Sequence, residues 1–252
     1  MSKLIKGVCE LLELLCEKSS PLGVSELSNI MLEGKSLIHK RLKILEDLGF
    51  VEQESYSKKY VLTTKLLELV NKSLKGYYNR TNINQYLQKV TKKTGETSLF
   101  GLKNSNNRII YLDKYHSENL INISTNIGDT PIPYCTAHGK ALLAFLDISE
   151  IENVINGGFK EFTKNTITDS RKLLGELKNI RELGYAEDNE ERELGFRCIA
   201  APIFDVRSNV IGAIGISGTI QRIPREKVSE HAKIIKDVAA KVSINIGNDI
   251  IF

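Results

Sequence analysis

The chain has 252 residues, of which 41% are hydrophobic and 26% are charged, and its formal net charge is +4. This balance is typical of a soluble globular protein with a substantial core, and it excludes a disordered chain, a collagen-like repeat and a disulfide-stabilised miniprotein. The length is sufficient for one large domain or two modest ones.

Neither a membrane anchor nor a signal peptide is expected. No apolar run approaches the roughly 18 residues needed to span a bilayer, and Glu10 and Glu13 interrupt the apolar residues of the N-terminus. We therefore expect a cytoplasmic protein with no membrane partner and with reduced thiols. The thiols are those of Cys9, Cys16, Cys135 and Cys198. Neither they nor the histidines show zinc-ligand spacing, so no metal or cofactor is expected.

Positive charge is concentrated in the first third of the chain. Residues 66–93 carry six Lys or Arg against one Asp or Glu. A polyanion could bind such a region, although solubility would explain the same distribution.

The first third also predicts three helices. Apolar residues recur at helical spacing over residues 3–17. Ser25 is expected to cap a second helix that runs to Met31. A third helix is expected from Lys35 to Leu48, and it should end at Gly49, since glycine suits the left-handed position after a helix.

The two sides of the third helix differ in chemistry. Ile38, Leu42 and Leu45 have the spacing of a core-facing stripe. The opposite side is polar and basic: Ser36, His39, Lys40 and Lys43, flanked by Lys35 and Arg41. Such a face fits the DNA major groove, although an ordinary solvated helix would have the same composition.

The residues after the third helix favour the DNA interpretation. Residues 50–53 and 58–62 resemble two short strands joined by the polar loop Glu54–Ser57, which together would form a wing. Three helices and a wing constitute a winged helix-turn-helix. The residues expected to contact base edges or phosphates are Ser25, Lys35, Ser36, Leu37, His39, Lys40, Lys43, Lys58 and Lys59. We set residues 1–64 as this domain, 65–82 as a linker helix and 83–252 as a second domain.

The second domain predicts an α+β fold. Two hairpins with interspersed helices indicate an antiparallel sheet flanked by helices. The expected strands are residues 97–102, 108–112, 119–124, 198–204 and 210–217, and the expected helices are residues 83–93, 140–145, 168–183 and 225–246.

Enzyme motifs are mostly absent. Gly139-Lys140 lacks the other residues of a phosphate-binding loop, and the acidic stretch 188–193 is interpreted as a solvated loop. Cys198 and His138 could form a nucleophile and base, but a Cys that opens an apolar strand is more often buried filler. We expect a protein that is not an enzyme, with this pair as the alternative.

Three motifs resemble those of the IclR family of bacterial transcription regulators. They are residues 134–144, which run into Gly-Lys-Ala-Leu-Leu-Ala, residues 193–205, and residues 214–218. Their order matches the family over essentially the whole chain. The resemblance implies a winged helix, a linker helix and an effector domain of GAF-like fold, in dimers or tetramers on a double-stranded DNA operator.

The resemblance also implies where a small-molecule effector would bind. The implied residues are Leu120, Ile123, Ala137, His138, Gly139, Asp188, Phe196, Cys198, Gly215 and Ser217. Small side chains would leave room for the effector, and the Gly139-Lys140 turn would present backbone N–H groups to an anion. The hydroxyl of Ser217 would donate a hydrogen bond.

The chain departs from the family pattern at several of these positions. Leu32-Glu33-Gly34 stands where members often have Gly-Leu-Pro, and Leu37 stands where they have Thr or Ser. Gly215 replaces a common Ser, and His138 replaces a small residue. The last two changes imply an effector different from small keto acids.

The expected function is therefore a ligand-responsive transcriptional regulator, a repressor in preference to an activator, that binds a small, anionic or polar organic metabolite. The alternatives are an enzyme that uses Cys198 and His138, and a constitutive DNA-binding protein whose effector pocket has closed.

Overall fold

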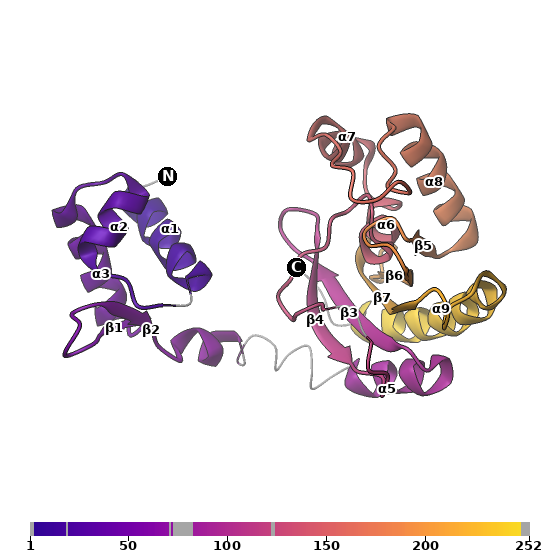
Figure 1. Ribbon diagram of the computed structural model, residues 1–252, viewed down its shortest axis with the longest axis horizontal. Coiled ribbons are helices and arrows are strands. Elements are labelled where there is room, and N and C mark those ends of the chain that lie inside the picture. Colours follow the sequence, from indigo (N-terminus) through magenta and orange to yellow (C-terminus); the bar gives the residue numbers. More distant parts are fainter. Residues whose placement is uncertain (1–2, 19, 71, 73–82, 122–123, 248–252) are drawn as a thin grey trace. The chain divides into compact units, whose positions relative to one another are not determined.

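The computed structural model describes residues 3–18, 20–70, 72, 83–121 and 124–247 (Figure 1). The chain divides into two compact units, Met1–Gly76 and Tyr77–Phe252.

The first unit contains the three predicted helices and the wing. Helices α1, α2 and α3 span Lys3–Glu17, Val24–Met31 and Lys35–Asp47, and strands β1 and β2 span Val51–Gln53 and Tyr60–Leu62. The strands pair antiparallel. Gly49 follows α3 with φ +78°, a left-handed conformation that suits a residue without a Cβ atom.

A single apolar cluster holds these elements together. It takes the inward-facing residues of each helix and the first residue of each strand, as the helical and strand periodicities predict. Its buried members are Leu11, Leu15, Leu22, Leu27, Ile38, Leu42, Leu45, Val51 and Tyr60.

The predicted cap of α2 is wrong. Gly23 is the N-cap residue, and Ser25 lies exposed inside the helix. The carboxylate of Glu26 accepts the N–H of Gly23 at 2.7 Å, so a side chain from within the first turn satisfies the backbone donor of the N-cap residue.

Most of the predicted linker helix lies outside the described residues. Residues 65–70 and residue 72 are helical. The predicted boundaries at residues 64 and 82 therefore stay predictions.

The second unit is a five-stranded antiparallel sheet with the order β4-β3-β7-β6-β5. The strands are β3 (Thr97–Lys103), β4 (Ile109–Tyr115), β5 (Ala186–Asn189), β6 (Phe196–Phe204) and β7 (Val210–Thr219). The helices are α5 (Ile83–Thr94), α6 (Ala137–Leu143), α7 (Ile148–Asn156), α8 (Ser170–Leu183) and α9 (Arg225–Gly247). The α+β prediction is confirmed.

Three predictions about individual elements of this unit are corrected. Residues 119–121 and 124, expected in a strand, are in none. Helix α7 and the edge strand β5 were not expected. The pattern of β5 is short and rich in acidic residues, which disfavour strands by propensity alone, so pairing with β6 decides its conformation.

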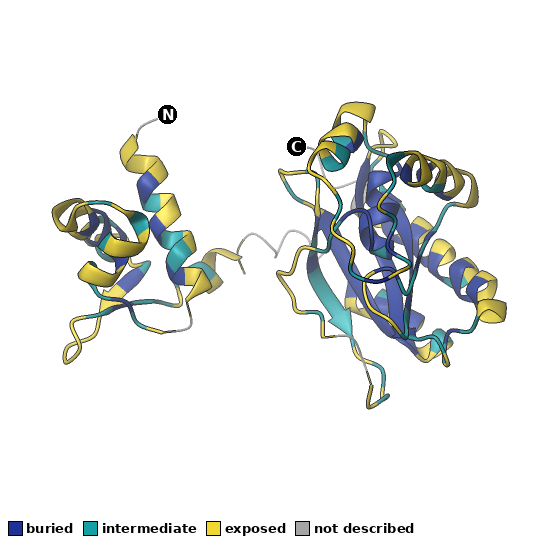
Figure 2. Cartoon of the chain, turned by 45° about the horizontal axis from the view of Figure 1, so that its top comes forward, coloured by how far each residue is buried: buried dark blue, intermediate teal, exposed yellow. Residues whose placement is uncertain are grey.

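The sheet separates two apolar layers. Helices α5 and α9 cover one face, where Ile214 and Ile216 of β7 point, and α6, α7 and α8 cover the other, where Ala213 points (Figure 1). The central strands are consequently buried along most of their length (Figure 2). Among the described helices, none is both long and apolar enough to cross a lipid bilayer.

Candidate functional site

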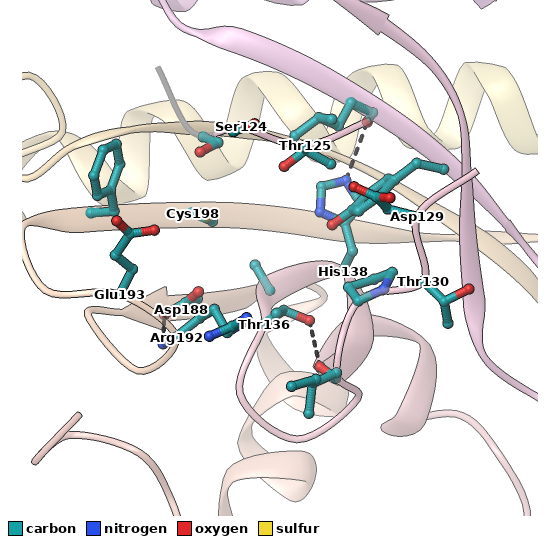
Figure 3. Close-up of a pocket in the computed structure, with 17 residues that line it drawn as sticks. Ser124, Thr125, Asp129, Thr130, Thr136, His138, Asp188, Arg192, Glu193 and Cys198 are labelled. Atoms are coloured by element: carbon teal, nitrogen blue, oxygen red, sulfur yellow. Dashed lines mark hydrogen bonds between the residues drawn. The ribbon is translucent and has the colours of Figure 1, made fainter. Parts of the chain in front are cut away.

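A cavity of about 380 Å³ opens between the α6 side of the sheet and the loop that follows β4. Residues predicted from the sequence line part of it: Ala137, His138, Asp188, Phe196, Cys198 and Ser217. Figure 3 shows His138, Asp188 and Cys198 among the side chains that surround the cavity.

Strand register brings three of these residues together. Asp188 of β5 lies opposite Cys198 of β6, and Cys198 lies opposite Ser217 of β7. Because directly opposite residues in a sheet point to the same face, their side chains form one row at the base of the cavity. The Oγ of Ser217 is buried and lies beside the thiol of Cys198, with no other polar partner among the described residues, so it keeps hydrogen-bonding capacity for a ligand.

Four predicted residues are not brought into this cavity lining. Leu120 is fully exposed, and Ile123 lies outside the described residues. Gly139 and Gly215 are absent from the lining. Each is packed closely: a Cβ at Gly139 would lie 2.6 Å from the Cα of Pro133, and one at Gly215 would overlap the carbonyl of Ile199. Glycine at both positions therefore allows close backbone packing.

The start of α6 differs from the expected anion site. The N–H of Gly139 is bonded to the Oγ1 of Thr136 at 3.2 Å, and that of Lys140 to the carbonyl of Thr136 at 2.9 Å. Thr136 in turn donates its hydroxyl to the carbonyl of Ile132 at 2.7 Å (Figure 3). The backbone groups expected to bind an anion at Gly139-Lys140 are thus already occupied within the fold.

His138 is a fixed wall of the cavity. Its Nε2 lies 3.2 Å from the carbonyl of Leu99, and its ring packs edge-on against Tyr111 with centroids 5.1 Å apart. Burial lowers the pKa of His138 to about 4, although the bond to Leu99 opposes this. The neutral imidazole then donates from Nε2 to Leu99.

A buried lysine organises the segment that follows β5. Lys140 is 1% exposed, and its Nζ lies 2.6 Å from Glu191 Oε1 and 3.0 Å from Glu176 Oε1. Burial opposes the charged form of Lys140, but the two carboxylates outweigh it and raise its pKa. The expected solvated loop at 188–193 is corrected accordingly, because Asp188 and Glu191 are buried.

Asp188 is a carboxyl in an unfavourable environment for charge. Burial and the nearby carboxylate of Glu191 raise its pKa to about 7, while hydrogen bonds from the backbone of Glu191 and Arg192 oppose the shift. The Oδ1 accepts the Glu191 N–H at 2.8 Å. Asp188 can therefore present either a donor or an acceptor to a ligand near neutral pH.

Cys198 does not have the environment of a nucleophile. Burial raises the pKa of its thiol, so the thiol stays protonated at neutral pH and unreactive. With the Nε2 of His138 directed at Leu99, this geometry disfavours the enzyme alternative.

The residues predicted from the sequence did not include much of the polar lining of the cavity. The loop after β4 contributes Ser124, Thr125, Asp129 and Thr130, and the turn after β5 contributes Arg192 and Glu193. The guanidinium of Arg192 lies 4.2 Å from the ring centroid of Phe162, a cation–π contact that orients it. The sequence feature that could have predicted these residues is the Ser/Thr-rich loop before the motif at residues 134–144.

The first unit has a separate polar surface on α3. Ser36, Leu37, His39 and Lys40 are exposed along this helix, with Lys35 at its start. Lys58, in the loop of the wing, is also exposed, with φ +57°. Within the described part of the chain, no ion-pair partner is found for Lys35, Lys40 or Lys58.

Three other cations that the sequence places on or beside the predicted DNA-binding surface are engaged in ion pairs. Lys43 lies 3.0 Å from Glu46 and 3.2 Å from Asp47, and Lys59 lies 3.1 Å from Glu26. These pairs are exposed, so a phosphate can compete for them. Arg41 is different: it was expected to flank the basic face, but it is buried and bound to Glu33.

The chain is similar over most of its length to known transcriptional regulators. The profile described as "Bacterial transcriptional regulator IclR C-terminal" matches residues 72–244. The HTH-type transcriptional regulator KdgR of Escherichia coli (strain K12) is 35% identical over 227 residues, 90% of this chain and 86% of that protein. The chain belongs to the IclR family of bacterial transcriptional regulators.

Solved structures of IclR proteins share this fold. That of the Thermotoga maritima IclR is 31% identical, with a TM-score of 0.73, and the match covers 98% of this chain and all of that one. An IclR homolog of Microbacterium hydrocarbonoxydans complexed with 4-hydroxybenzoate has a TM-score of 0.82 at 18% identity, over 97% and 99% of the two chains. The family resemblance inferred from the motifs is confirmed.

Replacing Lys140 should destabilise this IclR-family protein. Lys140→Met leaves Glu191 buried without its cation, which costs about 3–5 kcal/mol of unfolding free energy. Denaturant unfolding of the full chain measures the loss. Lys178→Met, at an exposed position of α8, is the control and should change the stability by less than about 0.5 kcal/mol. Equal stabilities for the two variants would contradict the role given to Lys140.

The raised pKa of Asp188 should make stability depend on pH. Between the ordinary carboxyl value of 3.8 and about 7, the folded protein keeps a proton that the unfolded chain releases. The contribution of Asp188 to stability therefore falls as pH rises through this window and is constant above it. Asp188→Asn removes that loss, so thermal melts should show a higher Tm than wild type at pH 8 and a smaller difference at pH 5. A difference independent of pH would refute this assignment.

Proposed function

We propose that this protein is a ligand-responsive DNA-binding repressor whose second unit binds a small, polar or anionic organic metabolite. The observation that carries the proposal is the exposed polar face of α3 in a winged helix-turn-helix, with Lys35, Lys40 and Lys58 free of ion pairs among the described residues. A helix of this kind after a tight turn is suited to the major groove.

The exposed residues fall into two groups according to the part of the DNA that they would contact, base edges or phosphates. Ser36, His39 and Lys40 lie on the outer face of α3 and would approach base edges, with Leu37 in apolar contact with a thymine methyl group. Lys35 and Lys58 would hold phosphates, and Lys43 and Lys59 would do so after exchanging their present carboxylate partners. Ser25, exposed near the start of α2, would add a phosphate contact.

The chemistry of the cavity supports a small polar effector. Hydroxyls of Ser124, Thr125, Thr130 and Ser217 line it with carboxyls that accept hydrogen bonds and with one guanidinium, Arg192. A ligand with hydroxyl groups and one carboxylate would satisfy both kinds of group. The 4-hydroxybenzoate complex of the distant homolog supports a small organic acid as occupant of this fold.

Effector and DNA would be coupled through a homo-oligomer, a dimer or tetramer on a palindromic operator. An effector changes DNA affinity only by its difference in affinity for the two arrangements of the protein. The cavity of about 380 Å³ argues against a constitutive binder with a closed pocket. The domain limits proposed for this arrangement are 1–64, 65–82 and 83–252.

DNA binding is tested on duplexes selected by the wild-type protein from a randomised pool. Lys40→Met should weaken binding to the selected duplex by about 1–3 kcal/mol, because it removes a base contact. Lys58→Met should weaken binding to all duplexes and reduce the salt slope by about 1, because it removes one phosphate contact. Lys178→Met is the control. If both variants bound as wild type does in a gel-shift titration, the contact assignment would be wrong.

Effector binding is tested by thermal shift against a panel of small organic acids and polyols. An acid that carries hydroxyl groups, at about 100 times its Kd, should stabilise the protein by about 2.7 kcal/mol. Ser217→Ala should weaken this binding by about 1 kcal/mol, since it removes one ligand hydrogen bond. Stabilisation that Ser217→Ala leaves unchanged would place the ligand elsewhere.

A further inference from the structure

Arg41 is the one residue of the polar side of α3 that points inward. It is 1% exposed, whereas Lys40 and Lys43 on either side of it are exposed. A charged group in the interior of a small domain is unfavourable unless it is paired. Its burial therefore depends on the groups that surround it.

Glu33 provides the pairing. Nη2 of Arg41 donates to Glu33 Oε1 at 3.0 Å, and Nη1 donates to Oε2. This is the two-pronged geometry that a guanidinium forms with a carboxylate and that an ammonium cannot reproduce. Glu33 lies in the turn between α2 and α3, so the pair ties this turn to the middle of α3.

The turn itself is held from both sides. Ser28 of α2 accepts the Glu33 N–H at its carbonyl, at 3.2 Å, and donates its hydroxyl to the Glu33 carbonyl. Leu32 adopts φ +54°, and Gly34 then begins α3 without a side-chain cap. The Arg41–Glu33 pair is therefore a side-chain contact that ties this turn to α3.

Gly7 makes room for this pair. It is buried in α1, and a Cβ at this position would overlap the guanidinium of Arg41. Glycine is a poor residue for a helix interior, so its presence here is explained by the space it leaves. Arg41 thus connects three elements: α1 at Gly7, the turn at Glu33, and α3.

One feature of the Arg41–Glu33 pair indicates that it orients α3 and contributes little to the stability of the fold. Arg41 Nε is buried and has no hydrogen-bond partner among the residues described. Buried ion pairs of this kind seldom stabilise more than apolar residues of the same size, whereas they can specify one arrangement.

We propose that Arg41 is a positioning residue for DNA recognition. Its guanidinium, seated over Gly7 and bound to Glu33, sets the angle at which α3 presents Ser36, His39 and Lys40 to base edges. The proposal rests on the DNA-binding function proposed above. It concerns discrimination between sequences, because the phosphate contacts proposed for Lys35 and Lys58 need no defined helix angle.

The test compares the selected duplex with a scrambled duplex of the same composition. Arg41→Met should weaken binding to the selected duplex by at least about tenfold and binding to the scrambled duplex by less than about twofold, since only base contacts need alignment. Arg41→Lys should lie between, because it keeps the charge and loses the two-pronged bond. Circular dichroism establishes that each variant is folded.

Substitution of Gly7 provides an independent test of the same proposal. Gly7→Ala should reproduce the loss of discrimination seen with Arg41→Met, because its methyl group displaces the guanidinium. Added to Arg41→Ala, which vacates the space, Gly7→Ala should cause no further loss. Leu42→Val, a destabilising change in the core of the same helix, should leave the ratio of the two affinities unchanged.

Each other outcome contradicts the proposal. Equal losses on both duplexes would make Arg41 a stabilising residue only, and unchanged affinities would remove any role in binding. Additive effects of Gly7→Ala and Arg41→Ala would show that Gly7 does not act through the position of the Arg41 guanidinium. If the wild-type protein selected no DNA sequence, the proposed function itself would be overturned. The Arg41 and Gly7 variants test only the positioning role.

Discussion

A buried cation must be paired, and this constraint shapes both units of the protein. In the first unit Arg41 binds Glu33 and lies over Gly7. In the second, Lys140 binds Glu191 and Glu176. Each cation holds a segment that would otherwise be an ordinary surface loop: the turn before α3, and the turn after β5. These two segments adjoin the surfaces proposed to bind DNA and effector. Because an unpaired charge in the interior is costly, each segment has one favoured position.

The antiparallel sheet supplies the base of the cavity proposed to bind an effector. Strand β7 is buried on both faces, so its register with β6 is strongly specified by the apolar pattern. That register places Ser217, Cys198 and Asp188 in one row, while α6 adds His138 from the neighbouring layer. The strands hold the row, and the hydroxyl-bearing loop after β4 lines the same cavity. A frame of this kind accommodates different ligands by changes in the loop and in single cavity residues such as His138.

The two sites differ in the way they use charge. The face of α3 keeps Lys35 and Lys40 solvated and unpaired among the described residues, as an approach to phosphates requires. On the cavity side His138 is buried and neutral, and Lys140, behind the lining, is bound to carboxylates.

Local sequence patterns determined the helices α1, α3 and α8, the wing and the two hairpins of the sheet, because each depends on periodicity within one segment. The motifs identified the family, and with it several residues of the cavity. Tertiary structure alone decided that Arg41, Asp188 and Glu191 are buried, since charged residues become inward-facing only when partners are present, and the partner of Glu191 lies 51 positions away. It also decided that β5 is a strand and that the loop after β4 lines the cavity. Short polar segments have no periodicity strong enough to predict either outcome.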